Sequence, residues 1–522
     1  MAGLAGNAAI EQDLGALASA VAARLERMRA ERVIERLWAQ DHNLWKPDPT
    51  EITNRLGWLR AVQVMAPELP RLRDFARTVA AEGYERVVLL GMGGSSLAPE
   101  VLYATFGRAS GGLSLTVLDA TDPAQVAAIE AAAPLDRTLF IVASKSGGTL
   151  ETLSHFAYFW ARAPRGAQFV AITDPGSALE AIGREHGFRE VFLNPSDIGG
   201  RYSALTYFGL VPAALIGVDL EALLASARAM TEACSNPDPA SNPGAWLGAV
   251  LGEGALVGRD QLTLVLPPAL ATLGTWLEQL IAESTGKEGT GVLPIEGEPL
   301  GPPEVYADRR LFVALGSAGK NPALQALAAA GHPVVRLPIE GAFALGGEFF
   351  RWEFATAIAG HVLGVHPFDQ PNVQSAKDAT AAILQRGIEA APASATSSAR
   401  ALLDGTQPGD YLAILAYLPH TPEVDARLQR VRVALRDRLR VATTIGYGPR
   451  YLHSTGQLHK GGPANGAFIE VVGDDPADLE IPGQPFTFGV LKRAQARGDL
   501  ESLASNGRRV ARTTLQEFEA LA

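Results

Sequence analysis

Residues 141–152 read IVASKSGGTLET. An apolar run of strand-forming residues leads into a turn of small polar residues around one lysine, and a helical segment starts near Thr149. The same order recurs along the first half of the chain, where apolar strand candidates at 85–91, 113–120, 138–144 and 167–174 alternate with amphipathic segments. Strand–helix alternation of this kind predicts parallel sheets that are covered by helices on both faces.

The second half continues the alternation, and two stretches of different composition interrupt it. Strand candidates lie at 261–267, 311–317 and 333–339, and two more at 411–418 and 467–473 flank a charged helix near 423–440. The interruptions are a Pro/Asn/Ser-rich link at 231–245 and a small-residue stretch at 389–401, which is either a linker or a weak helix. We therefore expect an α/β fold with a helical N-terminal segment (1–50), two doubly wound domains with mainly parallel sheets (51–230 and 231–390) and a C-terminal α/β extension (391–522).

Composition excludes several classes of partner. The chain has 522 residues and a formal charge of −11 without a basic block, so we expect no nucleic-acid partner. Cys234 is the single cysteine, which excludes an internal disulfide framework and indicates an inert thiol and a cytoplasmic location. No run reaches the roughly 18 apolar residues of a membrane helix, and the N-terminus lacks the pattern of a secretory signal, so we expect no membrane association. The nine histidines form no tight cluster with carboxylates, so we expect no metal site, zinc included.

The stretch LLGMGGSSLAPEVL (89–102) has the strand–turn–helix pattern of an anion site. Gly91 and Gly93 match the first two glycines of a dinucleotide-binding fingerprint, but Ser96 occupies the third position. By itself this loop fits anion capture at a helix N-terminus and a plain tight turn equally well.

The stretch 141–152 favours an anion site. Ser144, Ser146 and Thr149 offer hydroxyl groups, Lys145 offers a compact positive charge, and the two following glycines let the backbone approach a ligand. We expect Glu151 to complete the cap of the helix that follows. The alternative is an ordinary serine-capped helix with a solvated lysine. Two such loops at the carboxyl ends of strands in one domain favour a small phosphate pocket. The loop lacks the Gly-Lys-Ser/Thr ending of a P-loop, which argues against a nucleoside triphosphate.

These stretches also carry a family resemblance. GMGGSSL (91–97), SKSGGTLET (144–152) and GGRYSALTYFGLVPAALIG (199–217) resemble the sugar-isomerase domain of glucose-6-phosphate isomerases. Further matching stretches are LWKPDPTEITNRLGWL (44–59), ESTGKEGTGVLPIEGEP (283–299), FFRWEFATAIAG (349–360), FDQPNVQSAK (368–377) and YLHSTGQLHKGG (451–462). Together they span nearly the whole chain and are most similar to the isomerase half of bifunctional transaldolase/glucose-6-phosphate isomerase proteins, in which a transaldolase half would precede residue 1.

The resemblance implies reversible conversion of glucose 6-phosphate to fructose 6-phosphate through an enediolate, without a metal or an organic cofactor. It also implies two sugar-isomerase-type domains, a sugar-phosphate substrate, assembly as a homodimer and a functional link to a transaldolase. Carried over by residue, the phosphate would be held by Gly94, Ser95, Ser144, Lys145, Ser146 and Thr149. The catalytic residues would be Arg201, which stabilises the enediolate, Glu283, which acts as the base, and Lys377, with Gln370 beside it at the substrate.

The pattern around Glu283 supports that role. Leu273, Trp276 and Leu280 form an apolar helix stripe, and Glu283 comes three residues later on the same stripe. Burial and the negative end of the helix both disfavour its charged form, as suits a general base. The alternative is a frayed surface glutamate at a helix end. Glu278 lies off the stripe, and we expect it to be solvated.

Three other residues suit the site less specifically. Arg201 follows two glycines, so its guanidinium can enter a tight space near developing negative charge, although a structural ion pair with an aspartate is the alternative. Pro371 suits the first position of a helix, which would place Gln370 and Lys377 two turns apart on one face. A lysine on a solvated helix face is the alternative for Lys377.

Two features depart from the family pattern. Many relatives have a histidine that assists ring opening in a stretch that starts GEP, but GEPLGPPEVYADRRLF (297–312) contains none. Gly148 also replaces a threonine that is common in the phosphate loop. The ring-opening group therefore stays open among Tyr306, Asp308, His361, His366, His453 and His459.

Two other functions compete with a glucose-6-phosphate isomerase. A sugar-phosphate-binding regulator would need a DNA-binding or partner-binding module and no base, whereas this chain has no basic recognition segment and keeps Glu283 and Arg201. A dual isomerase for glucose and mannose phosphates differs only in its substrates, so only an assay separates it.

Overall fold

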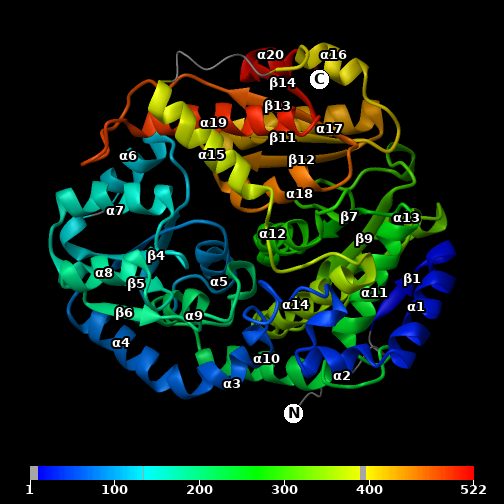
Figure 1. Ribbon diagram of the computed structural model, residues 1–522, viewed down its shortest axis with the longest axis horizontal. Coiled ribbons are helices and arrows are strands. Elements are labelled where there is room, and N and C mark those ends of the chain that lie inside the picture. Colours follow the sequence, from blue (N-terminus) through cyan, green and yellow to red (C-terminus); the bar gives the residue numbers. More distant parts are fainter. Residues whose placement is uncertain (1–9, 133, 388–394) are drawn as a thin grey trace.

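Three mainly parallel sheets form the framework of the computed structural model, which describes residues 10–132, 134–387 and 395–522 (Figure 1). The α/β class predicted from the sequence is confirmed, and every strand candidate named above forms a strand within three residues of its expected bounds. Part of the 389–401 stretch, residues 389–394, lies outside the described residues, and a short helix begins at Ala399.

The first sheet carries the loops with the phosphate-site pattern. Its five strands are parallel in the order β3 (Ser114–Leu118), β2 (Arg86–Gly91), β4 (Thr138–Ala143), β5 (Phe169–Thr173) and β6 (Glu190–Leu193). The helices of this region are α3 (Ala61–Met65), α4 (Leu69–Ala81), α5 (Leu97–Phe106), α6 (Pro123–Ala131), α7 (Leu150–Arg162), α8 (Ala178–Glu185) and α9 (Tyr207–Leu215). From β2 the chain passes to β3 on one side and then returns to β4 on the other, so the loops after β2 and β4 leave the sheet at a switch point.

The second sheet has the order β1 (Glu11–Asp13), β10 (Val334–Leu337), β9 (Arg310–Leu315), β7 (Gln261–Val265) and β8 (Leu293–Ile295). β1 is antiparallel to β10, and the other pairs are parallel. The N-terminal segment thus contains a strand besides its helices α1 (Ala18–Ala30) and α2 (Val33–Trp38). The remaining helices are α10 (Leu220–Ala233), α11 (Pro243–Leu256), α12 (Leu273–Thr285), α13 (Pro322–Ala329) and α14 (Ala344–Leu363).

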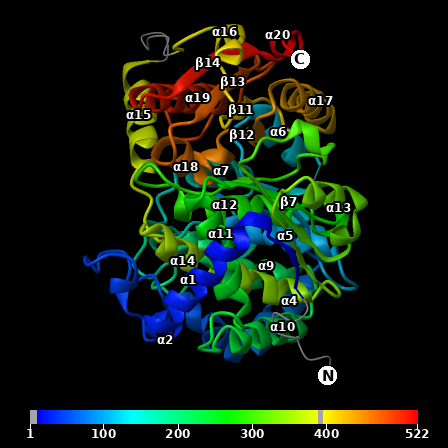
Figure 2. The same ribbon diagram turned by 90° about the vertical axis from the view of Figure 1, so that its right-hand side faces the viewer.

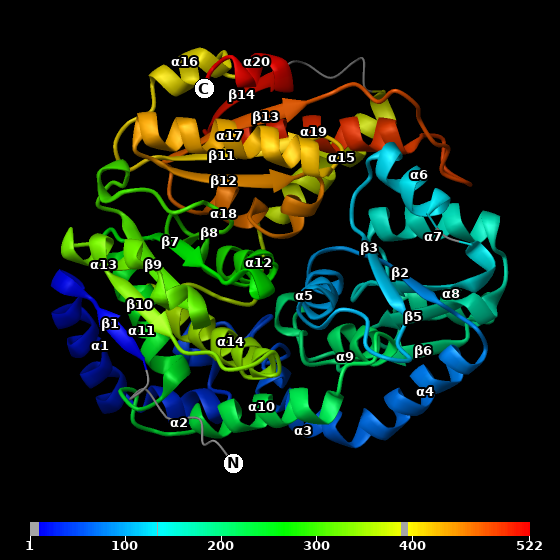
Figure 3. The ribbon, with the colours of Figure 1, turned by 180° about the vertical axis from the view of Figure 1, so that it is seen from behind.

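The third sheet lies above the other two in the views of Figures 1 and 2. Its strands are all parallel, in the order β12 (Ala442–Tyr447), β11 (Tyr411–Tyr417), β13 (Gly466–Val472) and β14 (Arg509–Thr514). The helices are α15 (Val373–Arg386), α16 (Ala399–Asp404), α17 (Pro422–Leu439), α18 (Gly456–Gly461), α19 (Phe488–Ser505) and α20 (Leu515–Glu519). Figures 1 and 3 show α19 and α15 on one face of this sheet and α17 on the other.

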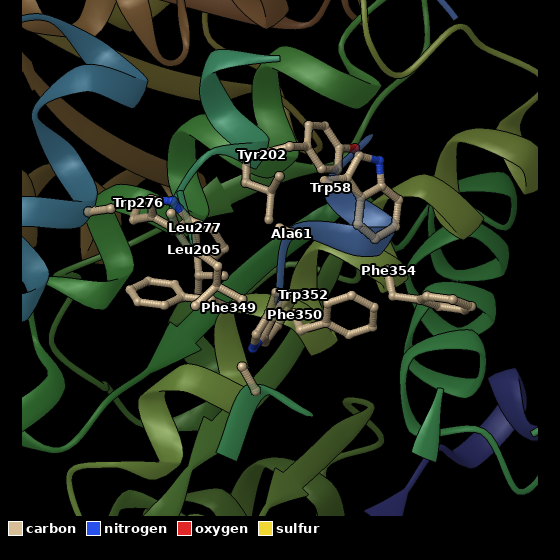
Figure 4. Close-up of a cluster of buried hydrophobic side chains, with 14 of the residues drawn as sticks. Trp58, Ala61, Tyr202, Leu205, Trp276, Leu277, Phe349, Phe350, Trp352 and Phe354 are labelled. Carbon is tan, nitrogen blue, oxygen red and sulfur yellow. The ribbon is translucent and has the colours of Figure 1, made fainter. Parts of the chain in front are cut away.

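A cluster of buried aromatic rings joins the first two regions (Figure 4). The ring of Trp58 lies 5.3 Å from that of Tyr202 and 5.8 Å from that of Phe350 on α14, and Trp276 on α12 lies 4.8 Å from Phe349. Tyr202 directly follows Arg201, and Trp276 precedes Glu283 by two turns of the same helix. Because truncating a buried aromatic side chain costs about 3–5 kcal/mol, this packing fixes the backbone from which both site residues project.

Among the described residues, no helix is both long and apolar enough to cross a membrane.

Candidate active site

The loops after β2 and β4 lie side by side, because Gly91 pairs with Ala143 at the carboxyl ends of the two strands. The loop after β2 also packs closely on the segment that carries Arg201. A Cβ atom at Gly94 would lie 2.1 Å from the carbonyl oxygen of Gly200, so a side chain there would push the two loops apart. Glycine at this position therefore brings the guanidinium-bearing segment up to the first loop.

The loop after β4 forms a small cup of hydroxyl and amide groups. The hydroxyls of Ser144 and Thr149 are hydrogen-bonded at 2.9 Å, and the Gly147 amide donates to Ser144 Oγ at 3.1 Å. The Gly148 amide donates to Ser146 Oγ at 3.4 Å. Gly147 has φ +70°, a conformation that a side chain disfavours, so the glycine keeps the turn tight. Ser95 of the neighbouring loop is buried.

Lys145 is held by a carboxylate and is not a freely solvated lysine. Its Nζ makes an ion pair with Asp174, which follows β5, and lies 3.4 Å from the carbonyl oxygen of Ser196. Burial raises the pKa of the Asp174 carboxyl above its ordinary value, although Lys145 opposes that shift. Asp174 Oδ1 is buried without a hydrogen-bond partner among the described residues. An anion bound in this loop would therefore share Lys145 with Asp174 or displace it.

Arg201 is buried and is fixed at several points. Its Nε donates to Ser284 Oγ at 2.8 Å, and Nη1 donates to Gln370 Oε1 at 3.0 Å. Nη2 donates to the carbonyl oxygens of Pro367 and Asp369, both at 2.8 Å. A guanidinium held by four hydrogen bonds is preorganised, so it can stabilise a nearby oxyanion without first having to reorient.

Glu283 lies next to this guanidinium. Its Oε1 is 3.3 Å from Arg201 Nη1, and its Oε2 accepts a hydrogen bond of 3.1 Å from Gln279 Nε2. The side chain is inward-facing, as the apolar stripe predicts, with only 9% of the residue exposed. The alternative of a frayed surface glutamate is wrong.

The expectation that Glu278 is solvated is also wrong. This residue is buried, and its Oε1 accepts a 3.0 Å hydrogen bond from Ser454 Oγ. Burial, assisted by the nearby Glu296 carboxyl, raises the pKa of Glu278 to about 8. The region of the third sheet packs over the side of α12 that carries Glu278. No local pattern in the sequence predicts this contact.

Gln370 contacts Arg201, whereas Lys377 lines a pocket that neither Arg201 nor Glu283 lines, and the two residues do not share one helix face. α15 begins at Val373, so Gln370 and Pro371 precede it, and Gln370 bonds Arg201 from the loop before the helix. Lys377 lines a pocket of about 300 Å³ whose other wall includes Gly148 and Thr149 of the loop after β4. This pocket joins the hydroxyl cup to α15.

His453 also lines this pocket and comes from the third region of the chain. Its Nε2 is hydrogen-bonded to Glu151 Oε1 at 3.0 Å, and its backbone carbonyl accepts a 2.7 Å hydrogen bond from Gln279. Gln495 Nε2 also donates to Glu151 Oε1, at 2.8 Å. Burial by itself raises the pKa of Glu151, but His453 outweighs it, and the pKa falls to about 2. Glu151 therefore orients an imidazole. The expectation that it completes the cap of α7 is wrong, because this helix has no side-chain cap.

The other five candidates for ring opening lie elsewhere, and none of them lines the pocket. The Tyr306 hydroxyl accepts a 2.6 Å hydrogen bond from the Gly301 amide, and Asp308 is exposed. The remaining three histidines are bound to other groups: His361 Nδ1 lies 2.7 Å from the Leu44 carbonyl oxygen, His366 Nε2 lies 3.1 Å from that of Thr50, and His459 Nδ1 lies 3.1 Å from the Tyr411 hydroxyl.

Sequence reasoning missed Lys287, which braces the segment that holds Arg201. Its buried ammonium lies 2.7 Å from both the carbonyl oxygen and the carboxylate of Asp369, and it also donates to the His366 carbonyl. Burial and the neighbouring Arg201 charge lower its pKa to about 7. The signal is its place in ESTGKEG, four residues after Glu283, within a matching stretch.

Comparisons with known proteins identify the family of this chain. A family model described as phosphoglucose isomerase matches residues 69–292, which include both loops, Arg201 and Glu283. A glucose-6-phosphate isomerase from Synechococcus sp. is 36% identical over 258 residues, 44% of this chain and 48% of the relative. The chain thus spans about half the length of the first curated relatives that it matches. A glucose-6-phosphate isomerase from Rubrobacter xylanophilus is 31% identical over 388 residues, 61% of this chain and 88% of the relative.

Two solved structures share the fold. A hypothetical protein from Thermus thermophilus aligns with a TM-score of 0.60 at 26% identity over 73% of this chain and 100% of its own. A glucose-6-phosphate isomerase from Chlamydia trachomatis aligns with a TM-score of 0.59 at 21% identity over 70% and 86%, which speaks for the fold alone. With a relative covered over 88% of its length at 31% identity, this chain belongs to the phosphoglucose isomerase family.

Proposed function

We propose that this chain catalyses the reversible isomerisation of glucose 6-phosphate and fructose 6-phosphate. One observation carries the proposal: a buried carboxylate, Glu283, lies 3.3 Å from the preorganised guanidinium of Arg201, beside loops that have the form of a phosphate cup. A base and a fixed cation at the same point are what proton transfer next to a carbonyl group requires.

The phosphate group would bind between the two loops. The hydroxyls of Ser144, Ser146 and Thr149 and the amides of the loop after β4 supply donors, Ser95 and Gly94 close the other side, and Lys145 supplies charge. This contact is remote from the reacting carbons, so its binding energy serves to position the open-chain sugar along the pocket toward Glu283.

Glu283 would then remove the proton from the second carbon of the open-chain aldose and return it to the first carbon, while the hydroxyl proton on the second carbon passes to the oxygen of the first. In between, an enediolate carries negative charge on oxygen, and Arg201 stabilises that charge. Gln279 holds Oε2 of Glu283, and Oε1 lies 3.3 Å from Arg201, where the enediolate would form. Gln370 orients Arg201, and Lys377, on the opposite wall of the pocket, binds the hydroxyls of the sugar.

His453 is the group that best fits ring opening. Opening the ring requires a proton for the ring oxygen and the removal of a proton from the hydroxyl on the anomeric carbon, while the bond between that carbon and the ring oxygen breaks. An imidazole in the same pocket, oriented by the Glu151 carboxylate, can supply and accept those protons.

The decisive test is turnover of fructose 6-phosphate with the Glu283→Gln variant, followed by deuterium incorporation at the second carbon of the product in heavy water. We expect turnover to fall by about three orders of magnitude or more and deuterium incorporation to fall with it. Glu288→Gln is the matched control, because this exposed glutamate is five residues away and pairs with Lys46. Equal turnover in both variants would remove Glu283 from the mechanism.

We further infer the finer features of the family resemblance, namely likeness to the isomerase half of transaldolase/isomerase proteins, a homodimer and a cytoplasmic location. The matching stretches support the first two, and the single cysteine supports the third. Sedimentation measurements of the purified chain, alone and with a separate transaldolase, test the assembly.

A further inference from the structure

A second pocket, of about 560 Å³, lies at the carboxyl edge of the third sheet. Tyr417 and Leu418 line it from the end of β11, Val472 and Gly473 from the end of β13, and Thr514 from the end of β14. The residues that line it differ from those that line the pocket of the candidate active site.

This place in the fold is a switch point of the sheet. β11 pairs with β12 on one side and with β13 on the other. The chain leaves β11 through α17 and leaves β13 toward α19, and these helices cover opposite faces of the sheet (Figures 1 and 3). Open parallel sheets bind ligands in the crevice that such diverging connections create.

The side chains that line this pocket are strongly basic, although the whole chain carries a formal charge of −11. Only one acidic residue, Asp474, is among them. The basic residues come from three elements: Arg427 on α17, Arg512 on β14, and Lys492, Arg493 and Arg497 on one face of α19.

These cations already have partners: Lys492 is buried between Asp122 and Asp475, but the pairing of the arginines leaves donors for a ligand. Arg427 donates twice to Glu519, at 2.8 and 2.7 Å, and Arg512 Nε donates to Glu470 at 2.6 Å. A guanidinium has five N–H donors, so such bonds use only part of its capacity. The side chains of Arg427, Arg512 and Arg493 are 31%, 29% and 46% exposed, so their remaining surface is open to a bound molecule.

Glu470, the partner of Arg512, does not fully compensate the positive charge of this arginine. Glu470 is buried, and its Oε1 has no hydrogen-bond partner among the described residues. Burial raises the pKa of Glu470 to about 7, so the carboxyl does not hold a full negative charge at neutral pH. The charge of Arg512 is thus only partly compensated from within the protein.

We propose that this pocket binds a small molecule that carries a diphosphate or polyphosphate group, such as a nucleoside diphosphate. Guanidinium groups from α17, α19 and β14 surround it, and a ligand with several phosphate oxygens contacts them together. Its volume exceeds the roughly 300 Å³ of the active-site pocket and lies in the range of small-molecule sites. The inference does not depend on the isomerase activity, because no residue of that mechanism lines this pocket.

The test is calorimetric titration of the purified chain with inorganic pyrophosphate at low ionic strength. Loss of two charge-assisted contacts in the Arg427→Gln/Arg493→Gln variant should raise Kd at least about tenfold. Arg430→Gln is the matched control, because this residue also lies on α17 and loses the same charge but does not line the pocket. We expect its Kd to stay within about twofold of the wild-type value, and turnover of fructose 6-phosphate to stay unchanged in all three proteins.

The active-site loop is the other place where pyrophosphate can bind, so the titration is repeated with the Lys145→Ala/Ser146→Ala variant. Binding should survive in that variant and should be stronger for ADP than for AMP, which has one phosphate group. Absence of binding to the wild-type chain at millimolar pyrophosphate overturns the proposal. Binding that is kept in Arg427→Gln/Arg493→Gln but lost in the loop variant overturns it as well.

Discussion

The hydroxyl cup after β4 and the pocket of the third sheet occupy equivalent places in two sheets but differ in the groups that they offer. The β2/β4 edge of the first sheet offers short hydroxyls and main-chain amides with one lysine, whereas the β11/β13 edge of the third sheet offers long guanidinium side chains from three elements. Topology places a crevice at both edges. Short, tightly bonded groups suit one small phosphate ester held in a fixed orientation, and longer side chains suit a larger and more highly charged ligand.

The two regions also differ in how their arginines are held. Arg201 is buried and donates to four acceptors, whereas Arg493 is 46% exposed with its nearest partner, Asp475, at 3.2 Å. A guanidinium fixed in advance stabilises charge that develops during a reaction, and a mobile one adapts to a bound ligand. The comparison therefore separates a site suited to the proposed chemistry from a site suited to the proposed binding.

The largest effect is expected from Arg201→Lys. Lysine keeps the charge but cannot make the four directed bonds to Ser284, Gln370 and the two carbonyl groups, so kcat should fall by about 10³-fold with a smaller change in KM. Steady-state kinetics with fructose 6-phosphate measure this. Arg493→Lys in the second pocket is the counterpart, and turnover should not change. A loss of less than about threefold for Arg201→Lys would refute the distinction between fixed and mobile guanidinium groups.

The next effect concerns His453→Gln, which tests whether the active site needs the third region of the chain. Loss of an acid–base group should lower kcat with glucose 6-phosphate by about 10²-fold. Erythrose 4-phosphate has no free hydroxyl that can close a ring, so its isomerisation should be spared. His361→Gln, whose histidine contacts the Leu44 carbonyl outside the pocket, serves as the control. Equal losses with both substrates would assign His453 a structural role.

A smaller effect is expected from Gly94→Ala. The added Cβ would meet the Gly200 carbonyl oxygen at 2.1 Å, so the two loops must separate, at a cost of about 1–3 kcal/mol in the free energy of unfolding. Gly148→Ala is the matched control from the other loop, since a Cβ added there would have no atom within 4 Å. Urea unfolding of the two variants measures the difference, and equal stability would mean that the loops are not in rigid contact.

The smallest effect concerns Glu470→Gln. Its folded-state pKa of about 7 lies above the ordinary 4.5, so the wild-type carboxyl is neutral at low pH and must be charged while buried as the pH rises. The charged groups that act on it are Arg512 and Arg497, which favour its charge, and Asp499, which opposes it. Stability of the wild-type chain is therefore lost between about pH 4.5 and 7 relative to the variant, and the variant should be more stable at pH 8 by about 1–2 kcal/mol.

At pH 4.5 the two proteins should unfold at the same urea concentration, and the affinity of the variant for pyrophosphate should exceed that of the wild-type chain only above pH 7. Glu517→Gln, an exposed acidic residue on α20, is the control. A stability difference that does not change with pH would contradict the charge argument for the second pocket.

Much of the fold could be predicted from the sequence because the central strands are apolar on both faces. Val87 to Leu90 of β2 and the whole of β4 are buried, and such runs are visible in any window of the chain. β8, β12 and β14 are not predicted, because they are short or polar and become strands only by pairing with a neighbour. The segment before Val373 is a loop and a turn for a similar reason, since Arg201 and Gln457 bond the residues that a local pattern assigns to a helix.

The sequence by itself determined the α/β class, the two glycine-containing loops and the family resemblance, because each depends on residues that are close together in the chain. It offered the inward direction of Glu283 as one of two alternatives. Tertiary structure alone decided that Asp174 holds Lys145, that Glu278 is buried, that His453 meets Glu151 from 302 positions away and that basic residues of α17, α19 and β14 surround one pocket. The physical reason is that burial, pKa and ion pairing are set by which segments pack together. A local sequence pattern predicts on which face of a helix or strand a residue lies, but not which distant segment packs against that face.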